Sequence, residues 1–264
     1  MLDCGHLKGI FGDMEKDILY LGDTALDNAA AYLAGVMTHY KISYDYLRSD
    51  EKFDSGLLEN NYKAVVISDY PAARFSEGQL EAIAKKVKAG TGLLMIGGWE
   101  SFTGLNLEYN ETILKELLPV VMKDSDDRVN CSQPAMVEKN KSHEIVDGLP
   151  FEDNPPAIGG FNQLKPKAGT EIILSVRRFK VSRMEGGFIF MPDGDADPLL
   201  VLGSFGKGRV VAYAGDVAPH WATGIVDWGE KRVAAQAKGA EGIEVGSDYM
   251  KFFFQLISWI RGGN

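Results

Sequence analysis

Apolar residues in the first hundred positions fall into short continuous runs that end in polar or glycine-rich turns. Residues 17–23, 64–69 and 92–98 are almost wholly apolar until their last positions, a pattern typical of strands that are buried on both faces. Residues 42–47 alternate between apolar and polar positions, as a strand with one exposed face does. The pattern therefore predicts four strands in this part of the chain.

Two helices are predicted between these strands. Residues 25–39 form an Ala-rich segment that follows Thr24, a residue type that caps helices. Residues 76–89 begin with Ser76 and carry Gln79 three positions later, which is the pattern of a capping box. The resulting β-α-β-β-α-β order predicts an α/β fold, a doubly wound parallel sheet with helices on both faces.

The second half of the chain changes to short apolar runs separated by Gly, Pro and Asp. These runs predict antiparallel strands or hairpins added to the main sheet, at residues 157–164, 171–176, 187–191 and 199–203. We expect a single domain over residues 1–264, with this antiparallel elaboration at about 150–205 and a loop insertion at about 225–247.

Three further segments complete the expected fold. Residues 111–122 predict a helix that is interrupted or ends near Pro119, and residues 208–216 predict another buried strand that ends in a polar loop. Residues 248–261 place aromatic and aliphatic side chains on one face of a helix, so we expect an amphipathic helix that closes the sheet.

Charge and composition narrow the classes of partner. The net charge of −9 argues against a nucleic-acid partner, because phosphate binding usually selects for a basic face. No apolar run approaches the roughly 18 residues that would span a membrane. Residues 1–17 carry four acidic side chains and lack the apolar segment of a signal peptide. We therefore expect a cytoplasmic protein without a membrane or nucleic-acid partner.

Neither a metal nor a cofactor is predicted. Cys4 and Cys131 are the two cysteines and have no Cys-x-x-Cys spacing, so they indicate neither a disulfide framework nor a zinc site. Residues 193–197 place three Asp at alternate positions, but a calcium loop of the EF-hand type would continue with a Gly and a Glu where this chain has Pro198 and Ser204. The glycines at 203–208 precede a strand, whereas a dinucleotide-binding fingerprint precedes a helix.

Candidate ligand-binding residues follow the expected parallel strands. In a doubly wound sheet, ligands bind at the carboxyl ends of the strands, where the strand order reverses. Four loops should meet there, at residues 22–23, 68–70, 98–101 and 216–221. The candidates that they contribute are Asp23, Asp69, Tyr70, Gly98, Trp99, Asp216 and Trp221.

The chain resembles the class I glutamine amidotransferase-like superfamily in three features. These are the order of the elements, the glycine pair before Trp99, and the segment Gly-Lys-Gly-Arg-Val-Val-Ala-Tyr-Ala-Gly-Asp at 206–216, which is followed by Pro-His-Trp at 219–221. Within it, the chain most resembles the branch called putative glutamine amidotransferases and is similar to trehalose-utilisation-type proteins. The resemblance covers about residues 18–260 and implies a flavodoxin-like fold.

This sequence departs from the catalytic pattern of that superfamily. The family's glutaminase chemistry uses a Cys in a Gly-x-Cys-x-Gly elbow and a late His-x-Glu pair. The resemblance places Trp99 at the position of the Cys, and Ala222 at that of the Glu, while His220 is kept. The oxyanion loop, usually rich in glycine, contains Tyr70 and Pro71, and Pro71 has no N–H to donate. We expect no glutaminase activity of the usual kind.

Three functional alternatives remain open at this point. A diverged protein would bind a small polar metabolite, such as a carbohydrate or an amino-acid derivative, in the strand-end crevice. An enzyme would use Glu100 as a general base, or Ser101 as a nucleophile, together with His220. An assembly module would bind another subunit through residues 229–246, and self-association into a homo-oligomer is an expectation for this fold. A fourth reading gives Glu100 and Trp99 structural roles, in capping and packing.

Overall fold

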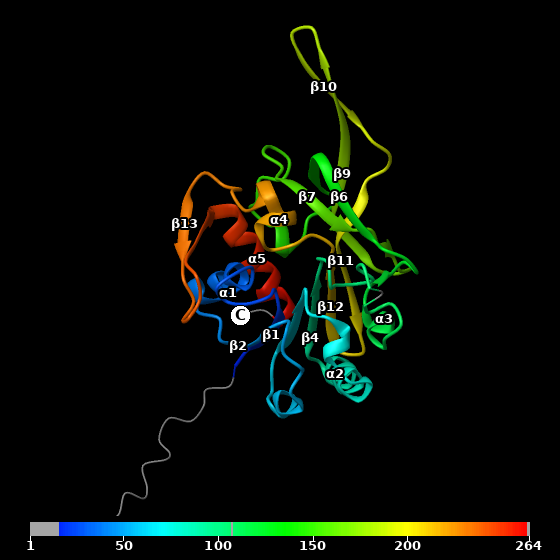
Figure 1. The fold of residues 1–264 in the computed structure, drawn as a ribbon, viewed down its shortest axis with the longest axis vertical. Coiled ribbons are helices and arrows are strands. Elements are labelled where there is room, and N and C mark those ends of the chain that lie inside the picture. The colour runs from blue at the N-terminus through cyan, green and yellow to red at the C-terminus, as the bar shows by residue number, and fades with distance from the viewer. Residues whose placement is uncertain (1–15, 107, 263–264) are drawn as a thin grey trace, which may run out of the picture.

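The computed structural model describes residues 16–106 and 108–262. Ten of the strands in this part of the chain form one mixed sheet (Figure 1). Its parallel half has the order β2-β1-β3-β4-β12, and its antiparallel half continues with β11-β9-β6-β7, while β10 pairs with β9. The expected α/β fold with added antiparallel strands is therefore confirmed.

The strands of the parallel half are β1 (Ile18–Gly22), β2 (Tyr44–Leu47), β3 (Ala64–Ser68), β4 (Gly92–Ile96) and β12 (Gly208–Tyr213). Every residue of β1, β3 and β4 is buried, as their continuous apolar sequences predict for strands covered on both faces. Their carboxyl ends lie at one edge of the sheet, and the loops of the candidate site begin there.

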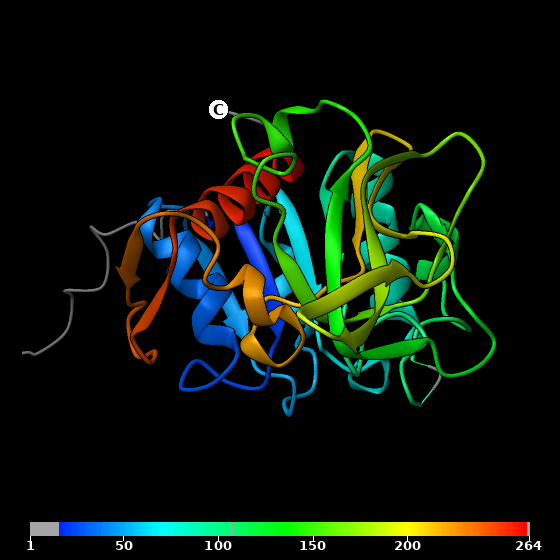
Figure 2. The same cartoon turned by 90° about the horizontal axis from the view of Figure 1, so that it is seen from above.

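Helices cover both faces of the parallel half (Figure 2). The main helices are α1 (Ala30–His39), α2 (Glu77–Ala89) and α5 (Ser247–Ile260); α1 contacts α5, and α2 contacts β12. The predicted capping box is present, because Ser76 Oγ accepts the N–H of Gln79 and the Gln79 side chain accepts the N–H of Ser76. Short helical turns lie at η1 (Ser55–Glu59), η2 (Ala72–Arg74), η3 (Glu144–Val146), α4 (Pro219–Ala222) and η4 (Thr223–Ile225).

Two helix predictions need correction. The first helix begins at Ala30 rather than near residue 25. The helix expected at 111–122 is only α3 (Leu114–Leu117), because Leu118 precedes a proline and takes an extended conformation with φ −62° and ψ 142°. The chain then forms β5 (Val120–Val121), which pairs with β8 (Lys165–Pro166).

The antiparallel half is larger than the expected elaboration. It contains β6 (Arg128–Lys139), β7 (Ala157–Asn162), β9 (Glu171–Met184), β10 (Gly187–Pro192) and β11 (Asp197–Phe205). The β6 strand begins before the expected region and was not predicted, because half of its residues are polar and it contains a proline. Residues 225–247 include a hairpin of β13 (Arg232–Ala235) and β14 (Ile243–Gly246). No helix of the described residues is long and apolar enough to cross a membrane.

Candidate functional site

Three aspartates lie together at the carboxyl edge of the parallel strands. Asp23 follows β1, Asp69 follows β3, and Asp216 follows β12 after two intervening residues. They are close enough that Asp216 raises the pKa of both of the others by charge repulsion. Asp23 and Asp69 both take left-handed backbone conformations, with φ 52° and 44°, which Asp tolerates better than most residues. No group of three or more acidic, His or Cys side chains in the described ranges is arranged to hold a metal ion.

Asp23 is the innermost of the three carboxyls. It is 2% exposed and accepts hydrogen bonds from the hydroxyls of Tyr20 and Ser68. Burial, followed by the charges of Asp216 and Asp69, raises the pKa of Asp23 well above its ordinary range. The turn that carries it requires glycine at position 22, because a Cβ there would lie 1.6 Å from the carbonyl oxygen of Ser68.

Asp69 lies directly against the elbow that follows β4. Its Oδ1 accepts the N–H of Glu100 at 2.8 Å, and its own N–H donates to Ser101 Oγ at 3.0 Å. The contact is so close that a Cβ at Gly98 would lie 2.0 Å from Asp69 Oδ1. Burial and then the charge of Asp216 raise the pKa of Asp69 to about 8. Burial also raises the pKa of Asp216 to about 6, although the N–H groups of Val217 and Ala218 oppose this shift.

A buried amide, the side chain of Asn162, holds the other side of the elbow. Asn162, at the end of β7, accepts the N–H of Gly98 at 2.9 Å and donates to the carbonyl of Gly98 at 3.1 Å. It also donates to Asp127, whose carboxyl oxygens accept the N–H groups of Thr103 and Gly104. Sequence reasoning missed Asn162 and Asp127, although an amide at the end of the apolar run 157–162 was a usable signal.

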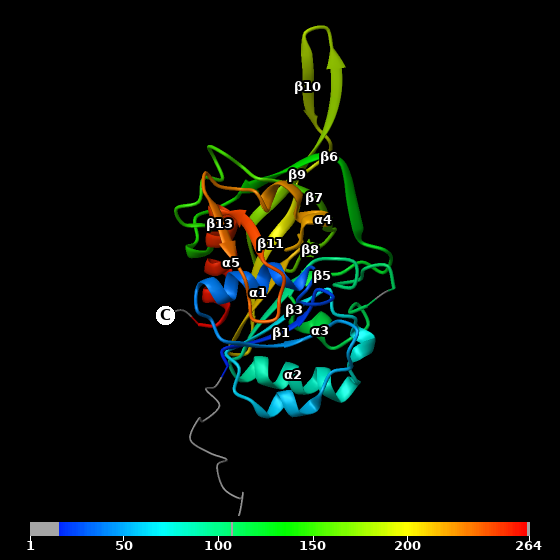
Figure 3. The same ribbon diagram turned by 60° about the vertical axis from the view of Figure 1, so that its left-hand side comes forward.

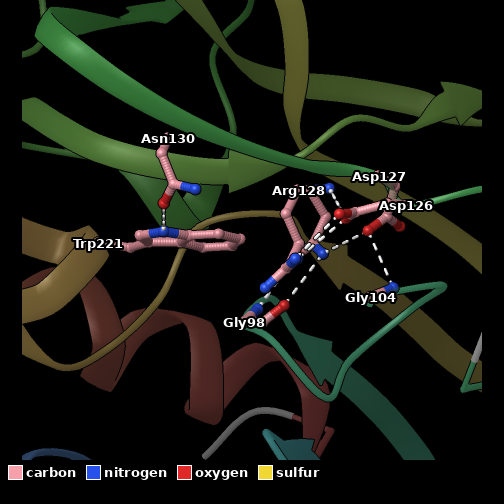
Figure 4. Close-up of polar contacts among 8 residues, drawn as sticks. Gly98, Gly104, Asp126, Asp127, Arg128, Asn130 and Trp221 are labelled. Atoms are coloured by element: carbon pink, nitrogen blue, oxygen red, sulfur yellow. Dashed lines mark hydrogen bonds and ion pairs between the residues drawn. The ribbon is translucent and has the colours of Figure 1, made fainter. Parts of the chain in front are cut away.

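Trp99 is the residue that the elbow presents to the surface. Its side chain is 46% exposed, the guanidinium of Arg128 lies 4.5 Å from the ring centroid, and the ring of His220 meets it edge-on at 5.8 Å. The structure thus brings together the two positions that the resemblance matched to the family's Cys and His. Trp221, by contrast, is buried and donates its indole N–H to Asn130 (Figure 4).

The two other predicted catalytic residues occupy different surroundings. Glu100 is half-buried, and its pKa is raised by burial and by Glu108 and lowered by Arg74. Among the described residues, no hydrogen bond or ion pair joins Glu100 to His220. Ser101 is fully buried, with its hydroxyl bonded to the backbone of Asp69.

Tyr70, a predicted ligand-binding residue, lies in the core. Its ring is fully buried and its hydroxyl donates to the carbonyl oxygen of Glu51 at 2.8 Å. The groups of the candidate site that solvent reaches are therefore Trp99, Glu100, Asp69 and His220.

A cavity of about 370 Å3 opens near the same edge of the sheet, where β1 and β2 end. Tyr46, Arg48, Asp27 and Glu51 are among its lining residues. The Tyr46 hydroxyl donates to the carbonyl of Gly22 at 2.9 Å, which joins this cavity to the Asp23 turn. This edge of the sheet thus offers both positively and negatively charged side chains to a ligand.

The fold and the position of the elbow define a class I glutamine amidotransferase-like protein. The family model described as "Putative glutamine amidotransferase" matches residues 16–234, and the chain belongs to this family. A comparison with curated proteins gave no match.

Solved structures support the fold. The cytoplasmic proteins STM3548 and STM1381 of Salmonella typhimurium are similar over 92% of this chain and 98% of their own, with TM-scores of 0.70 and 0.69 and identities of 24% and 26%. A β-galactosidase from Rahnella sp. R3 is similar over 92% of this chain but 31% of its own, with a TM-score of 0.51 and 13% identity. At 13% identity the likeness shows the fold alone.

The buried hydroxyl of Ser101 gives a test of its role. Replacing Ser101 by Ala leaves the N–H of Asp69 without its partner, and we expect a loss of about 1–2 kcal/mol of unfolding free energy, measured by urea denaturation. The exposed Ser204 provides a matched control, and Ser204→Ala should change stability by less than about 0.5 kcal/mol. Equal stability of Ser101→Ala and the parent protein would contradict a structural role for this hydroxyl.

Proposed function

We propose that this protein binds a small polar metabolite at the carboxyl edge of its parallel strands and carries out no Cys-dependent glutamine hydrolysis. One observation carries this proposal: the N–H of Glu100 already donates a hydrogen bond to Oδ1 of Asp69. That N–H belongs to the residue after position 99, where the family's nucleophile would stand.

Acyl transfer needs a nucleophilic atom and free backbone donors for the oxyanion that forms when the carbonyl is attacked. In elbows of this kind, the N–H after the nucleophile is one of those donors. Here position 99 has an indole, which has no nucleophilic sulfur or oxygen, and Asp69 is already bonded to the following N–H. The retained His220 has no thiol to deprotonate at this position.

The accessible groups suit recognition of a polyol or an ammonium compound. The half-exposed indole of Trp99 can stack on the C–H face of a sugar, and Glu100, Asp69 and His220 can bond its hydroxyl groups. The carboxylate of Glu100 can also bond the ammonium group of an amino-acid derivative. Because the two similar Salmonella proteins are named as cytoplasmic proteins, the proposed ligand is a metabolite of the cytoplasm.

The test combines a reaction assay with a binding assay. Purified protein is incubated with glutamine and ammonia release is measured, and thermal unfolding is followed with a panel of sugars, polyols and amino acids. We expect no ammonia above the blank. We also expect at least one compound to stabilise the native state, by about 2.7 kcal/mol when present at 100 times its dissociation constant.

Variants locate the binding site. Trp99→Ala should abolish the stabilisation by the compound, and Val121→Ala, which also shortens an exposed apolar side chain, should keep it. Hydrolysis of glutamine by the parent protein would overturn the proposal, and so would a stabilisation that Trp99→Ala leaves intact.

A further inference from the structure

A β-hairpin projects from the body of the molecule at the end remote from α2 (Figures 1 and 3). We call this hairpin the arm. It consists of residues 179–192, in which the last part of β9 pairs with β10. The arm holds five of the large exposed apolar side chains of the protein, and every residue of β10 is exposed. These five are Met184, Phe188, Ile189, Phe190 and Met191.

The arm has the chemistry of a surface that another molecule covers. A two-stranded hairpin alone in water is marginally stable, and an apolar strand at an open edge is prone to pair or pack with another chain. In the register of the hairpin, Phe188 lies opposite Arg183, and Phe190 lies opposite Val181. Since side chains two positions apart share a face, one face of the arm presents aromatic rings beside a guanidinium.

Charge distinguishes the arm from the rest of the chain. The arm contains two basic side chains, Lys180 and Arg183, and one acidic side chain, Glu185, in a protein whose net charge is −9, and Arg177 and Arg178 lie at its base. Arg177, Arg178 and Lys180 have acidic partners within the same chain. Arg183 has no ion-pair partner among residues 16–106 and 108–262, so its charge is available to a partner molecule.

The complementary surface is a groove on the same protein between α2 and α3. The groove has a volume of about 590 Å3, and Phe75, Leu80 and Ile113 provide apolar lining. Its remaining lining includes four glutamates, among them Glu81 and Glu116, and one lysine. An acidic groove with apolar lining matches the aromatic face of the arm, which carries the guanidinium of Arg183.

We propose that the arm of one copy docks in the α2–α3 groove of a second copy, and that the second copy's arm docks reciprocally in the first. The arm and α2 lie at opposite ends of the molecule (Figure 1), so two antiparallel copies related by a twofold axis bring each arm beside the other's groove. Phe188 and Phe190 pack in the groove, and Arg183 faces its glutamates.

The area is sufficient for such a dimer. The exposed side chains of Phe188, Phe190 and Arg183 on this face offer roughly 300 Å2 per arm if each buries about 100 Å2. Two arms and the matching groove surfaces then bury about 1,200 Å2 in total, which is the lower end of the range for stable protein interfaces.

The first test measures the mass of the full-length chain by light scattering as its concentration is varied. The parent protein should have twice its chain mass of 28.9 kDa at tens of micromolar. The double variant Phe188→Ser/Phe190→Ser should weaken the dimer at least tenfold without changing thermal unfolding of the monomer. The matched control on the opposite face, Ile189→Ser/Met191→Ser, should weaken it less than threefold.

The second test identifies the groove by charge reversal. Arg183→Glu should raise the dimer dissociation constant at least fivefold. Adding Glu81→Lys to that variant should restore most of the lost affinity between the two copies. Arg48→Glu, at an exposed ion pair that belongs neither to the arm nor to the lining of the groove, should have no effect. A parent protein that stays monomeric at tens of micromolar, a dimer insensitive to the phenylalanine variants, or a charge swap without rescue would each overturn the proposal.

Discussion

Between about pH 5 and pH 8, the parent protein should lose about 3 kcal/mol of unfolding free energy through Asp69, and Asp69→Asn should remove this loss. In the folded protein, burial and the charge of Asp216 raise the pKa of Asp69 to about 8, from an ordinary value of 3.8. The unfolded chain therefore ionises first, at the lower pH. The stabilisation is fully present below about pH 4 and is lost as the pH rises through the folded pKa.

The measurement is urea denaturation at several pH values in this range. Asn keeps an oxygen that can accept the N–H of Glu100, so the variant should fold and differ mainly in the slope of stability against pH. The exposed Asp50 gives the control: Asp50→Asn should keep the slope of the parent protein. A parental slope in Asp69→Asn would show that the Asp69 carboxyl is ionised in the fold at neutral pH.

Replacing Asn162 by Ala should lower the unfolding free energy by about 3–4 kcal/mol, because it removes three buried hydrogen bonds. The N–H and carbonyl of Gly98 lose the partner that Asn162 provides, and Oδ1 of Asp127 loses one of its two donors and keeps the N–H of Gly104. The loss is measured by urea denaturation, and near-ultraviolet circular dichroism should report a change around the Trp99 and Trp221 indoles.

The control for this variant is Asn140→Ala. Asn140 is exposed, and its side chain donates to Ser175 Oγ at 2.8 Å. Its removal should cost less than about 1.5 kcal/mol. If Asn162→Ala costs no more than Asn140→Ala, the elbow does not depend on the amide.

Sequence patterns predicted the parallel half of the sheet well. The runs at 17–23, 64–69 and 92–98 became β1, β3 and β4, because an apolar run between helices has few alternatives to burial on both faces. The antiparallel half was predicted less completely. The β6 strand, in which half of the residues are polar, gains its stability from pairing with β7 and β9, and its own sequence does not reveal those contacts.

The candidate site, like the sheet, was predicted only in part from the sequence. The resemblance placed Trp99 and His220 at matching positions, and the structure brings their rings within 5.8 Å. The sequence could not show that Asp69 bonds the N–H of Glu100, or that Ser101 is buried beneath the elbow. Both contacts join loops that follow different strands, so they depend on strand order and register.

By itself, the sequence determined the family, the parallel sheet and the absence of a Cys at the elbow, because residue identity and apolar periodicity are local properties of the chain. Only the tertiary structure decided which polar groups have hydrogen-bond partners and which side chains remain exposed to solvent. Asp69 and Asn162 hold the elbow from two sides, the pKa values of the aspartates depend on their shared burial, and the arm leaves its apolar side chains in solvent. These properties arise from distances between residues far apart in the chain, which local patterns do not specify.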